Sequence, residues 1–195
     1  MKDKILNYAV DFLNRQGDYS KNDLLKIRYG LEGIYLTITK LLIILVVSLL
    51  MSITKEIVIC LLLFNIIRYF SFGFHAEKSY ECLILSLLNF IVIPYLLLNF
   101  YRPFIIDIIL AAFCLILLGI FSPADTVKRP LKSKKKRTFR KLVTLIIGSI
   151  YFTLMIIFKN HYISDLLLCV LVVDVIVVNP VTYWIFKQPY NNYKN

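Results

Sequence analysis

The chain alternates long apolar stretches with short polar segments from about residue 34 to its end. Several of these stretches are long enough to cross a hydrocarbon layer of about 30 Å as an α-helix. Lipid offers no hydrogen-bond partner to an open backbone, so such segments must be helical. We therefore predict an all-α, polytopic integral membrane protein with about six transmembrane helices. The predicted spans are residues 34–51, 56–70, 81–101, 104–122, 142–158 and 163–186.

The first 33 residues have a different pattern, in which apolar and charged positions are mixed. Apolar residues recur there at near-helical spacing, first near the N-terminus and again after Ser20. Lysine and arginine residues stand between them, as in helices that lie on a membrane surface. We expect residues 1–33 to form amphipathic interfacial helices, residues 34–186 the six-helix transmembrane domain and residues 187–195 a short cytoplasmic tail.

The composition agrees with a chain that is embedded in lipid. Hydrophobic residues make up 59% of the 195 residues, and the mean hydropathy is +0.73. A soluble domain of this size has too small a core to hide so much apolar surface. The composition therefore excludes an ordinary water-soluble enzyme or binding domain.

Lysine and arginine outnumber aspartate and glutamate by 23 to 12, which gives a net charge of +11. Positive residues favour the cytoplasmic connections of membrane proteins. With six spans and both termini inside, 20 of the 23 basic residues fall on the cytoplasmic side, nine of them in the basic loop 123–141. We therefore expect a multi-pass protein of the cytoplasmic membrane with both termini in the cytoplasm. Orientation and anionic membrane lipids explain the excess charge, so no nucleic acid partner is predicted.

The four cysteines are scattered, with no Cys-x-x-Cys pair and no ligand spacing typical of a zinc site. We therefore predict no disulfide framework, metal or other cofactor. Cys60, Cys114 and Cys169 lie among Leu, Ile and Val residues and are interpreted as small apolar packing residues. Cys82 differs, because His75 precedes it by seven residues in the polar connection between the second and third predicted spans.

His75 and Cys82 are candidates for a base and a nucleophile. In one unbroken helix, a step of seven residues rises by about 10.5 Å, which is too far for an imidazole to hydrogen-bond a thiol. A working pair therefore requires a break in the helix between them. Gly73 loosens the backbone just before His75, and Ser79 is a suitable N-cap for the third span, with Cys82 in its first turn.

A cysteine in the first turn of a helix lies near unbonded backbone N–H groups and the positive end of the helix dipole. This setting and a protonated imidazole nearby favour the thiolate, which is the nucleophilic form. The same N–H groups are able to bind the oxyanion of an acyl-transfer intermediate. Glu77 or Glu81 is a candidate to orient His75, and the residues alone do not choose between them. The competing interpretation is structural, with Cys82 as a packing residue and His75 in contact with lipid headgroups.

Several motifs follow one another along nearly the whole chain. They are Lys-Ile-Arg-Tyr-Gly-Leu-Glu-Gly at residues 26–33, Arg68, Gly-Phe-His-Ala at residues 73–76, Cys82, and Ser-Pro-Ala-Asp-Thr at residues 122–126 before the basic loop. In this order they resemble the accessory gene regulator B (AgrB) family of bacterial quorum-sensing peptidases. The resemblance implies that His75 and Cys82 are the catalytic pair and that Arg68 and Gly73 are further motif positions. The usual glycine pair before the histidine is Phe72-Gly73 in this chain.

The resemblance also implies an activity and partners. Such peptidases remove the acidic C-terminal tail of a small amphipathic precursor through an acyl-enzyme, after which an internal Cys or Ser of the precursor closes a thiolactone or lactone. Residues 34–186 are then a transmembrane peptidase domain, and the protein is a homodimer in a bacterial cell membrane. The basic loop is expected to attract the acidic tail, or alternatively to anchor the topology and bind anionic lipid. The candidate substrate-binding residues are Lys128, Arg129, Lys132, Lys134, Lys135, Lys136 and Arg137.

Two other functions stay open from the residues alone. The first is a peptide transporter or export channel without peptidase activity, in which Asp174, near the middle of the last predicted span, and the polar inner ends of the helices line a path. The second is a non-catalytic membrane scaffold, for which no acyl adduct forms on Cys82. Near Asp174, the dipeptide Asn179-Pro180 is expected to kink the last helix.

Overall fold

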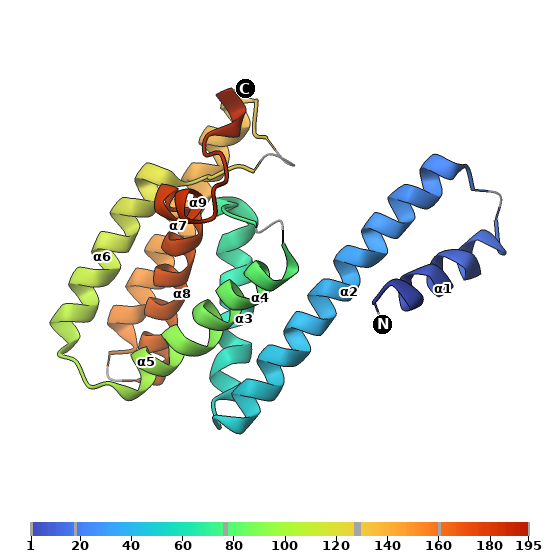
Figure 1. Ribbon diagram of the computed structural model, residues 1–195. Helices are drawn as coiled ribbons and strands as arrows, with labels where there is room; N and C mark the ends of the chain where they lie inside the picture. Colours follow the sequence, from blue (N-terminus) through green and yellow to red (C-terminus); the bar gives the residue numbers. More distant parts are fainter. Residues whose placement is uncertain (1, 18, 76–77, 127–129, 160, 195) are drawn as a thin grey trace. The chain divides into compact units, whose positions relative to one another are not determined.

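The computed structural model describes residues 2–17, 19–75, 78–126, 130–159 and 161–194. Within these ranges the regular secondary structure is helical, and the predicted all-α class is confirmed (Figure 1). The helices are α1 Lys2–Asn14, α2 Lys21–Leu50, α3 Thr54–Ser71, α4 Ser79–Leu87, α5 Ile93–Asn99, α6 Phe104–Phe121, α7 Lys134–Ile157, α8 Tyr162–Val178 and α9 Pro180–Ile185. A π-helical turn, Leu88–Val92, joins α4 to α5, and a 3-10 turn, Asn192–Lys194, lies in the C-terminal tail.

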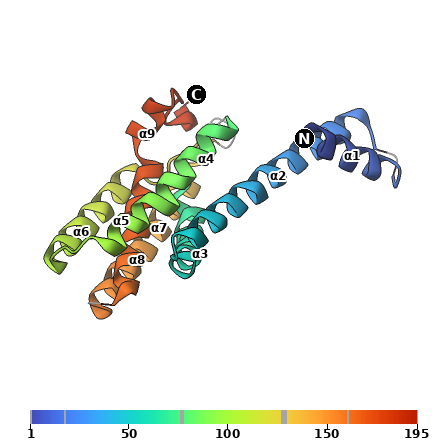
Figure 2. The ribbon, with the colours of Figure 1, turned by 60° about the horizontal axis from the view of Figure 1, so that its bottom comes forward.

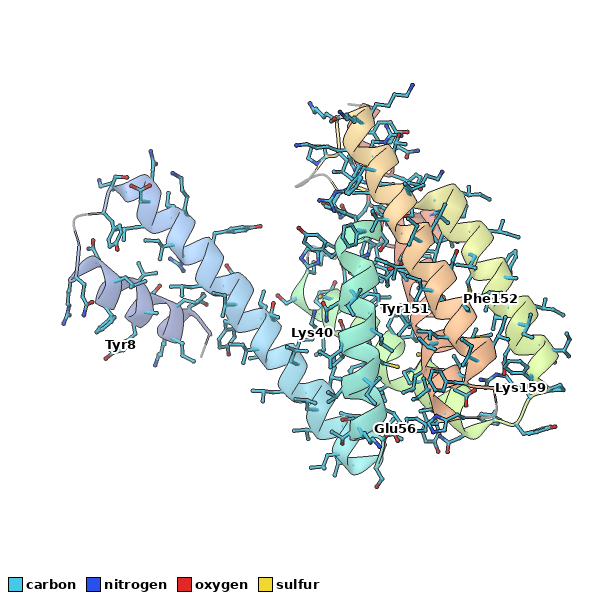
Figure 3. All side chains as sticks on the ribbon, turned by 180° about the vertical axis from the view of Figure 1, so that it is seen from behind. Tyr8, Lys40, Glu56, Tyr151, Phe152 and Lys159 are labelled. Atoms are coloured by element: carbon cyan, nitrogen blue, oxygen red, sulfur yellow. The ribbon has the colours of Figure 1, made fainter. Side chains whose placement is uncertain are left out.

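The chain divides into two compact units, residues 1–47 and 48–195. In the first unit, α1 turns back beside the first half of α2 (Figure 1). Arg28 of α2 forms an ion pair with Asp3 of α1 at 3.8 Å, and Tyr8 of α1 is exposed (Figure 3). The second unit contains the helices from α3 onward and every candidate catalytic residue.

The continuity of α2 differs from the sequence prediction, which ended a surface helix at residue 33 and began a separate span after it. α2 is one helix of 30 residues, so the predicted helix boundary at residue 33 is wrong. Gly30 and Gly33 lie inside this helix, and no proline follows them to end it. Glycine alone weakens a helix by only about 1 kcal/mol, which the long apolar stretch after it offsets. The interfacial position of residues 1–33 stays a prediction.

Four helices in the described part of the chain are long and apolar enough, by length and composition, to cross a membrane. Three of them are α2, α6 and α7. The fourth is the continuous segment Ser79–Asn99, which includes α4 and α5. The chain is therefore a multi-pass membrane protein, and the predicted count of about six spans is not confirmed. Of the remaining predicted spans, α3 carries three charged residues, and α8 has 17 residues, which reach only about 26 Å.

α8 is the central helix of the second unit. It packs against α3, α5, α6 and α7 (Figures 1 and 2), and twelve of its 17 residues are buried. Beside it, the Tyr151 hydroxyl of α7 donates a hydrogen bond of 2.9 Å to the Leu63 carbonyl of α3 (Figure 3). A helix that is apolar on every side is stable only when protein or lipid surrounds it. Here protein surrounds α8, which explains why apolar residues lie on every side of it.

The last predicted span, residues 163–186, is divided at Asn179-Pro180. α8 ends before Asn179, whose side-chain oxygen accepts a hydrogen bond of 2.9 Å from the Val181 N–H and so caps α9. Pro180 takes the first position of α9, where a missing N–H costs no helical hydrogen bond. The kink predicted at this dipeptide is confirmed.

The second unit has a different polar cluster at each end. At one end, the α3–α4 and α6–α7 connections meet α9 and the C-terminal tail (Figure 1). At the other end, Arg102 donates hydrogen bonds to Asp107 of α6 and to Asp165 of α8, the second at 2.6 Å. Removing one member of such a partly buried cluster leaves an uncompensated charge, so the ion pairs hold α6 and α8 to the α5–α6 connection. The candidate catalytic residues lie at the first of these ends.

Candidate functional site at the α3–α4 connection

The α3–α4 connection contains the helix break that the candidate pair requires. α3 ends before Phe72 and Gly73, which have positive φ angles of 58° and 109°. The next helix that the structure describes, α4, begins at Ser79. His75 and Cys82 therefore do not lie on one straight helix, and the predicted break between them is confirmed.

Gly73 is required by both its backbone angle and its surroundings. Residues with a side chain rarely adopt a φ of 109°. A Cβ atom at this position would lie 2.1 Å from Nη1 of Arg68 and 2.7 Å from the carbonyl oxygen of Val177. Gly73 thus allows α3, the loop and the end of α8 to approach one another closely. From the sequence alone, Gly73 was interpreted as a point that loosens the backbone.

Backbone hydrogen bonds fix the path of the chain before the histidine. The Gly73 N–H donates to the Ala124 carbonyl at 2.6 Å, and the Ala124 N–H donates to the Ser71 carbonyl at 3.0 Å. The Phe74 N–H donates to the Val177 carbonyl, near the end of α8, at 2.8 Å. An unpaired backbone group in the protein interior raises the free energy of the folded state, so these bonds strongly favour one conformation of the loop.

Side chains from α3, from α8 and from Phe186, which follows α9, reinforce this loop. Nη2 of Arg68 donates to the Phe74 carbonyl at 2.7 Å. The Phe74 ring is buried and stacks on Phe186, with the ring centres 4.7 Å apart. The Ser71 hydroxyl donates to Oδ1 of Asp174 at 2.8 Å, and Asp174 is fully buried in α8. The predicted motif residue Arg68 therefore holds the loop, and the carboxylate of Asp174 pairs with the end of α3.

His75 lies within the connection, and Cys82 lies just after it, in α4. His75 is exposed and directly follows the anchored loop. Cys82 is half-buried, whereas the other three cysteines are buried, and none of the four forms a disulfide. The Cys82 N–H donates to the Lys78 carbonyl at 3.1 Å, which is the first hydrogen bond of α4. The thiol therefore lies in the first turn of a helix, as the sequence predicted.

The predicted N-cap is wrong by one residue. The cap residue is Lys78, with φ −91° and ψ 136° and no side-chain capping hydrogen bond, so Ser79 is already the first helical residue. The Glu81 carboxylate lies 3.5 Å from Nζ of Lys78. A side-chain hydrogen bond with Tyr80 and the charge of Glu81 raise the pKa of Lys78. Glu77, the other candidate to orient the histidine, lies outside the described residues.

The basic loop contains both exposed lysines and arginines that bind other parts of the protein. Of the candidate substrate-binding residues, Lys132, Lys134, Lys135 and Lys136 are exposed, and Lys128 and Arg129 lie outside the described residues. The guanidinium of Arg137 lies 3.3 Å from the ring centre of Tyr193. Arg140 donates to the Tyr69 carbonyl at 2.7 Å and lies over the Phe72 ring at 4.3 Å. The basic start of α7 therefore lies beside the α3–α4 connection.

Two residues at this end were not selected as site candidates from the sequence. Asp125, within the Ser-Pro-Ala-Asp motif, is buried, and its carboxylate accepts a hydrogen bond of 2.9 Å from the N–H of Asn192. Close to it, burial raises the pKa of Tyr190 to about 12. The Ser-Pro-Ala-Asp motif was the sequence signal from which Asp125 could have been selected. No signal pointed to Asn192, because its partner lies 67 residues away in the chain.

Comparisons with known proteins agree on one family. A family model described as Accessory gene regulator B matches residues 6–178. An AgrB-like protein of Clostridium acetobutylicum is 31% identical over 183 residues, which cover 93% of this chain and 87% of the relative. An AgrB-like protein of Listeria innocua is 34% identical over 176 residues, with coverages of 87% and 83%. The Accessory gene regulator protein B of Staphylococcus aureus is 26% identical over 160 residues, with coverages of 82% and 84%.

No solved structure gives a significant match to this chain. The family model includes the α3–α4 connection, the Ser-Pro-Ala-Asp motif, the basic start of α7 and the whole of α8. The relatives cover more than four fifths of the chain, two of them at more than 30% identity. The resemblance drawn from the motifs is therefore confirmed, and the chain belongs to the accessory gene regulator B family.

Proposed function

We propose that this protein is a membrane cysteine endopeptidase in quorum sensing, which removes the C-terminal tail of a small amphipathic signal-peptide precursor and promotes its cyclisation. The observation that carries the proposal is the α3–α4 connection. There an anchored loop presents exposed His75, and the first turn of a helix holds Cys82, the one cysteine that is not buried. Membership of the accessory gene regulator B family supports the quorum-sensing role.

The chemistry follows from a thiol and an imidazole that act in turn. His75 takes the proton of the Cys82 thiol, and the sulfur attacks the scissile carbonyl carbon of the precursor. The C–N bond breaks, His75 returns the proton to the departing amine of the tail, and a thioester to Cys82 remains. An internal Cys or Ser of the precursor then gives its proton to His75 and attacks the thioester carbonyl. The C–S bond to Cys82 breaks, a thiolactone or lactone closes, and the Cys82 sulfur takes up the proton from His75.

The start of α4 supplies donors for the oxyanion. The first intrahelical hydrogen bond is made by the N–H of Cys82, so the N–H groups of Ser79, Tyr80 and Glu81 precede it. Such N–H groups stabilise negative charge on a carbonyl oxygen, and the helix dipole adds to the effect. Apolar surroundings at the membrane would keep water from the thioester, so that its acyl energy is kept for ring closure.

The basic start of α7 is the proposed binding site for the acidic tail of the precursor. Lys132, Lys134, Lys135 and Lys136 are exposed there, and Arg140 joins the same helix to the end of α3. Charges that are close to a site and of the opposite sign raise the local concentration of a charged substrate. The same lysines are expected to contact anionic membrane lipids, which are the second proposed partner.

The topology of the enzyme is proposed to include six crossings. α3 has 18 residues, about 27 Å, and packs along α7 and α8, so we include both α3 and α8 among the segments that lie within the bilayer. Six crossings bring both termini, the α3–α4 connection and the basic loop to the cytoplasmic face of the bacterial membrane. We also propose a homodimer, by analogy with the family.

Asp174 gives little support to the alternative of a transporter. Its side chain is fully buried, and Oδ1 accepts a hydrogen bond from Ser71. A carboxylate that lines a transport path is expected to be reached by water. The contacts of Asp174 favour a structural role at the end of α3.

Substitution of the pair tests the peptidase. In proteoliposomes that contain the cognate precursor, Cys82→Ser and His75→Ala are each expected to reduce cleavage by about 1,000-fold or more, because the two residues act as one unit. The matched controls Cys114→Ser and His161→Ala are expected to keep full activity. The unsubstituted enzyme should also form a precursor thioester on Cys82, detected by mass spectrometry. Unchanged cleavage by Cys82→Ser would overturn the proposal.

A further inference from the structure

The C-terminal tail is held at the same end of the second unit as the α3–α4 connection. Asn192 is buried, and its backbone N–H donates to Oδ1 of Asp125 at 2.9 Å. Its side-chain Nδ2 donates to the carbonyls of Asp125 and Pro189, at 3.3 Å and 2.9 Å. The second carboxylate oxygen of Asp125 accepts a hydrogen bond of 3.1 Å from the N–H of Leu131. One buried carboxylate therefore joins the tail to the segment that leads into α7.

The chain next to Asp125 is bonded to the loop that precedes His75. Ala124, its neighbour, donates to the carbonyl at the end of α3 and accepts from the N–H of Gly73. These two hydrogen bonds surround Phe72, which forms an isolated bridge with Ala124. Displacement of Asp125 would therefore move a segment that lies three residues before the histidine.

Tyr183 of α9 connects the same two segments through its side chain. Its hydroxyl donates to the carbonyl oxygens of Asp125 and Ala124, at 3.0 Å and 3.3 Å. Its ring packs edge-to-face on Phe74, with the ring centres 5.6 Å apart. The tail, the Ser-Pro-Ala-Asp segment, α9 and the loop thus form one continuous set of buried contacts around Asp125.

We propose that Asp125 is a positioning residue of the peptidase and that the tail it binds is part of the support that orients His75. The inference rests on the proposed function. Asp125 touches neither the substrate nor the reacting atoms, and it acts on the histidine through Ala124 and Gly73. The C-terminal tail then contributes to catalysis from more than a hundred residues away in the sequence.

The geometry requires a carboxylate at this position. Both oxygens of Asp125 accept hydrogen bonds from backbone N–H groups, and a carboxylate is acceptor-only. Asparagine has one acceptor oxygen and one NH₂ group, so one of the two N–H donors would face another donor. An unpaired buried donor loses its full hydration energy, which favours release of either the tail or the segment before α7.

Three variants of the full-length enzyme test the inference. They are Asp125→Asn, a deletion of residues 191–195, and a matched deletion of residues 194–195 that keeps Asn192 and Tyr193. We measure kcat and KM for precursor cleavage, normalised to folded enzyme in detergent. We also measure the rate of Cys82 alkylation by iodoacetamide as a function of pH, because this profile depends on the position of His75.

We expect Asp125→Asn and the deletion of residues 191–195 each to lower kcat by about tenfold or more, with KM changed by less than about twofold. Their alkylation profiles should move towards that of His75→Ala. The double variant should be no slower than the slower single variant, because both changes break the same link. The deletion of residues 194–195 should match the unaltered enzyme.

The inference is overturned if the variants only lower the yield of folded protein while kcat and the alkylation profile stay normal, since that is a purely structural effect. Additive losses in the double variant would overturn the link between Asp125 and the tail. If Cys82→Ser loses cleavage while Asp125→Asn keeps normal kinetics, this inference is contradicted and the proposed function is not. Normal cleavage by Cys82→Ser overturns the proposed function, and this inference with it.

Discussion

At the residue scale, Gly73, in the loop before His75, has no room for a side chain. Its φ is 109°, and a methyl group in place of its hydrogen would overlap with Nη1 of Arg68 and the Val177 carbonyl. A strained backbone of this kind costs about 1–3 kcal/mol, and the overlap adds to that cost. The loop is therefore compatible with glycine and with no residue that has a side chain.

Gly73→Ala is therefore expected to lower the thermal midpoint of unfolding in detergent and to abolish precursor cleavage. Gly30→Ala is the matched control, because no atom lies within 4 Å of a Cβ built at that helical position. Alanine there is expected to be neutral or to stabilise the helix by up to about 1 kcal/mol. Equal melting behaviour of the two variants would contradict the close approach at Gly73.

Arg68 acts at the residue scale through the shape of its guanidinium. One nitrogen donates to the Phe74 carbonyl, while the other lies against Gly73. Lysine has a single nitrogen and cannot fill both positions. Arg68→Lys is expected to reduce kcat for cleavage by about tenfold or more, measured per folded enzyme. Arg28→Lys, in the exposed pair with Asp3, is the control, and a similar loss there would contradict this role.

At the scale of elements, the first two turns of α7 are proposed to have two roles. Its exposed lysines are proposed to attract an acidic substrate, while Arg140 donates a hydrogen bond to the Tyr69 carbonyl at the end of α3. Long-range attraction and local support have different kinetic signatures. Attraction alters KM and depends on salt, because the screening length falls from about 10 Å at 0.1 M to about 3 Å at 1 M.

The combined substitution of Lys134, Lys135 and Lys136 by glutamine is expected to raise KM several-fold at low salt without a change in kcat. The difference should disappear at 1 M salt. Arg140→Gln is expected to lower kcat instead, because the α3 end loses a hydrogen bond of 2.7 Å. Steady-state cleavage assays at two salt concentrations separate these effects. A KM effect of the lysines that is independent of salt would contradict an electrostatic role.

At the scale of the whole molecule, the connections between the helices of the second unit lie at two opposite ends of the bundle (Figure 1). The α3–α4 and α6–α7 connections and the tail lie at one end, and Arg102 with its two carboxylates lies at the other. If the bundle crosses the membrane, these two ends face different compartments. The membrane orientation is then decided by the basic residues of the first end.

Single cysteines in a variant without native cysteines test this orientation. Lys132→Cys and Lys187→Cys are expected to be protected from a membrane-impermeant maleimide in intact cells, because they lie at the proposed cytoplasmic end. Lys55→Cys and Lys159→Cys are expected to react without permeabilisation. Labelling is measured by gel shift before and after the cells are opened. Labelling of Lys132→Cys in intact cells would contradict the proposed topology.

The sequence by itself determined the helical membrane class, the break before Cys82 and the separate position of Cys82 among the four cysteines. These properties are local, because they depend on the composition of a stretch and on breakers such as Gly73 or Pro180 within a few residues. Local rules failed at Ser79, because the cap lies one residue earlier, and at residue 33, because one helix continues through the change from mixed to apolar sequence.

Only the tertiary structure decided which distant residues meet. It made α8 a buried central helix, joined Arg68 to the Phe74 carbonyl, and brought Asp125 to Asn192 across 67 residues of chain. An isolated stretch of sequence contains no record of these contacts, because each depends on how several helices pack against one another. The candidate catalytic residues could therefore be selected from their neighbours in the chain, whereas the distant residues that contact their loop could not.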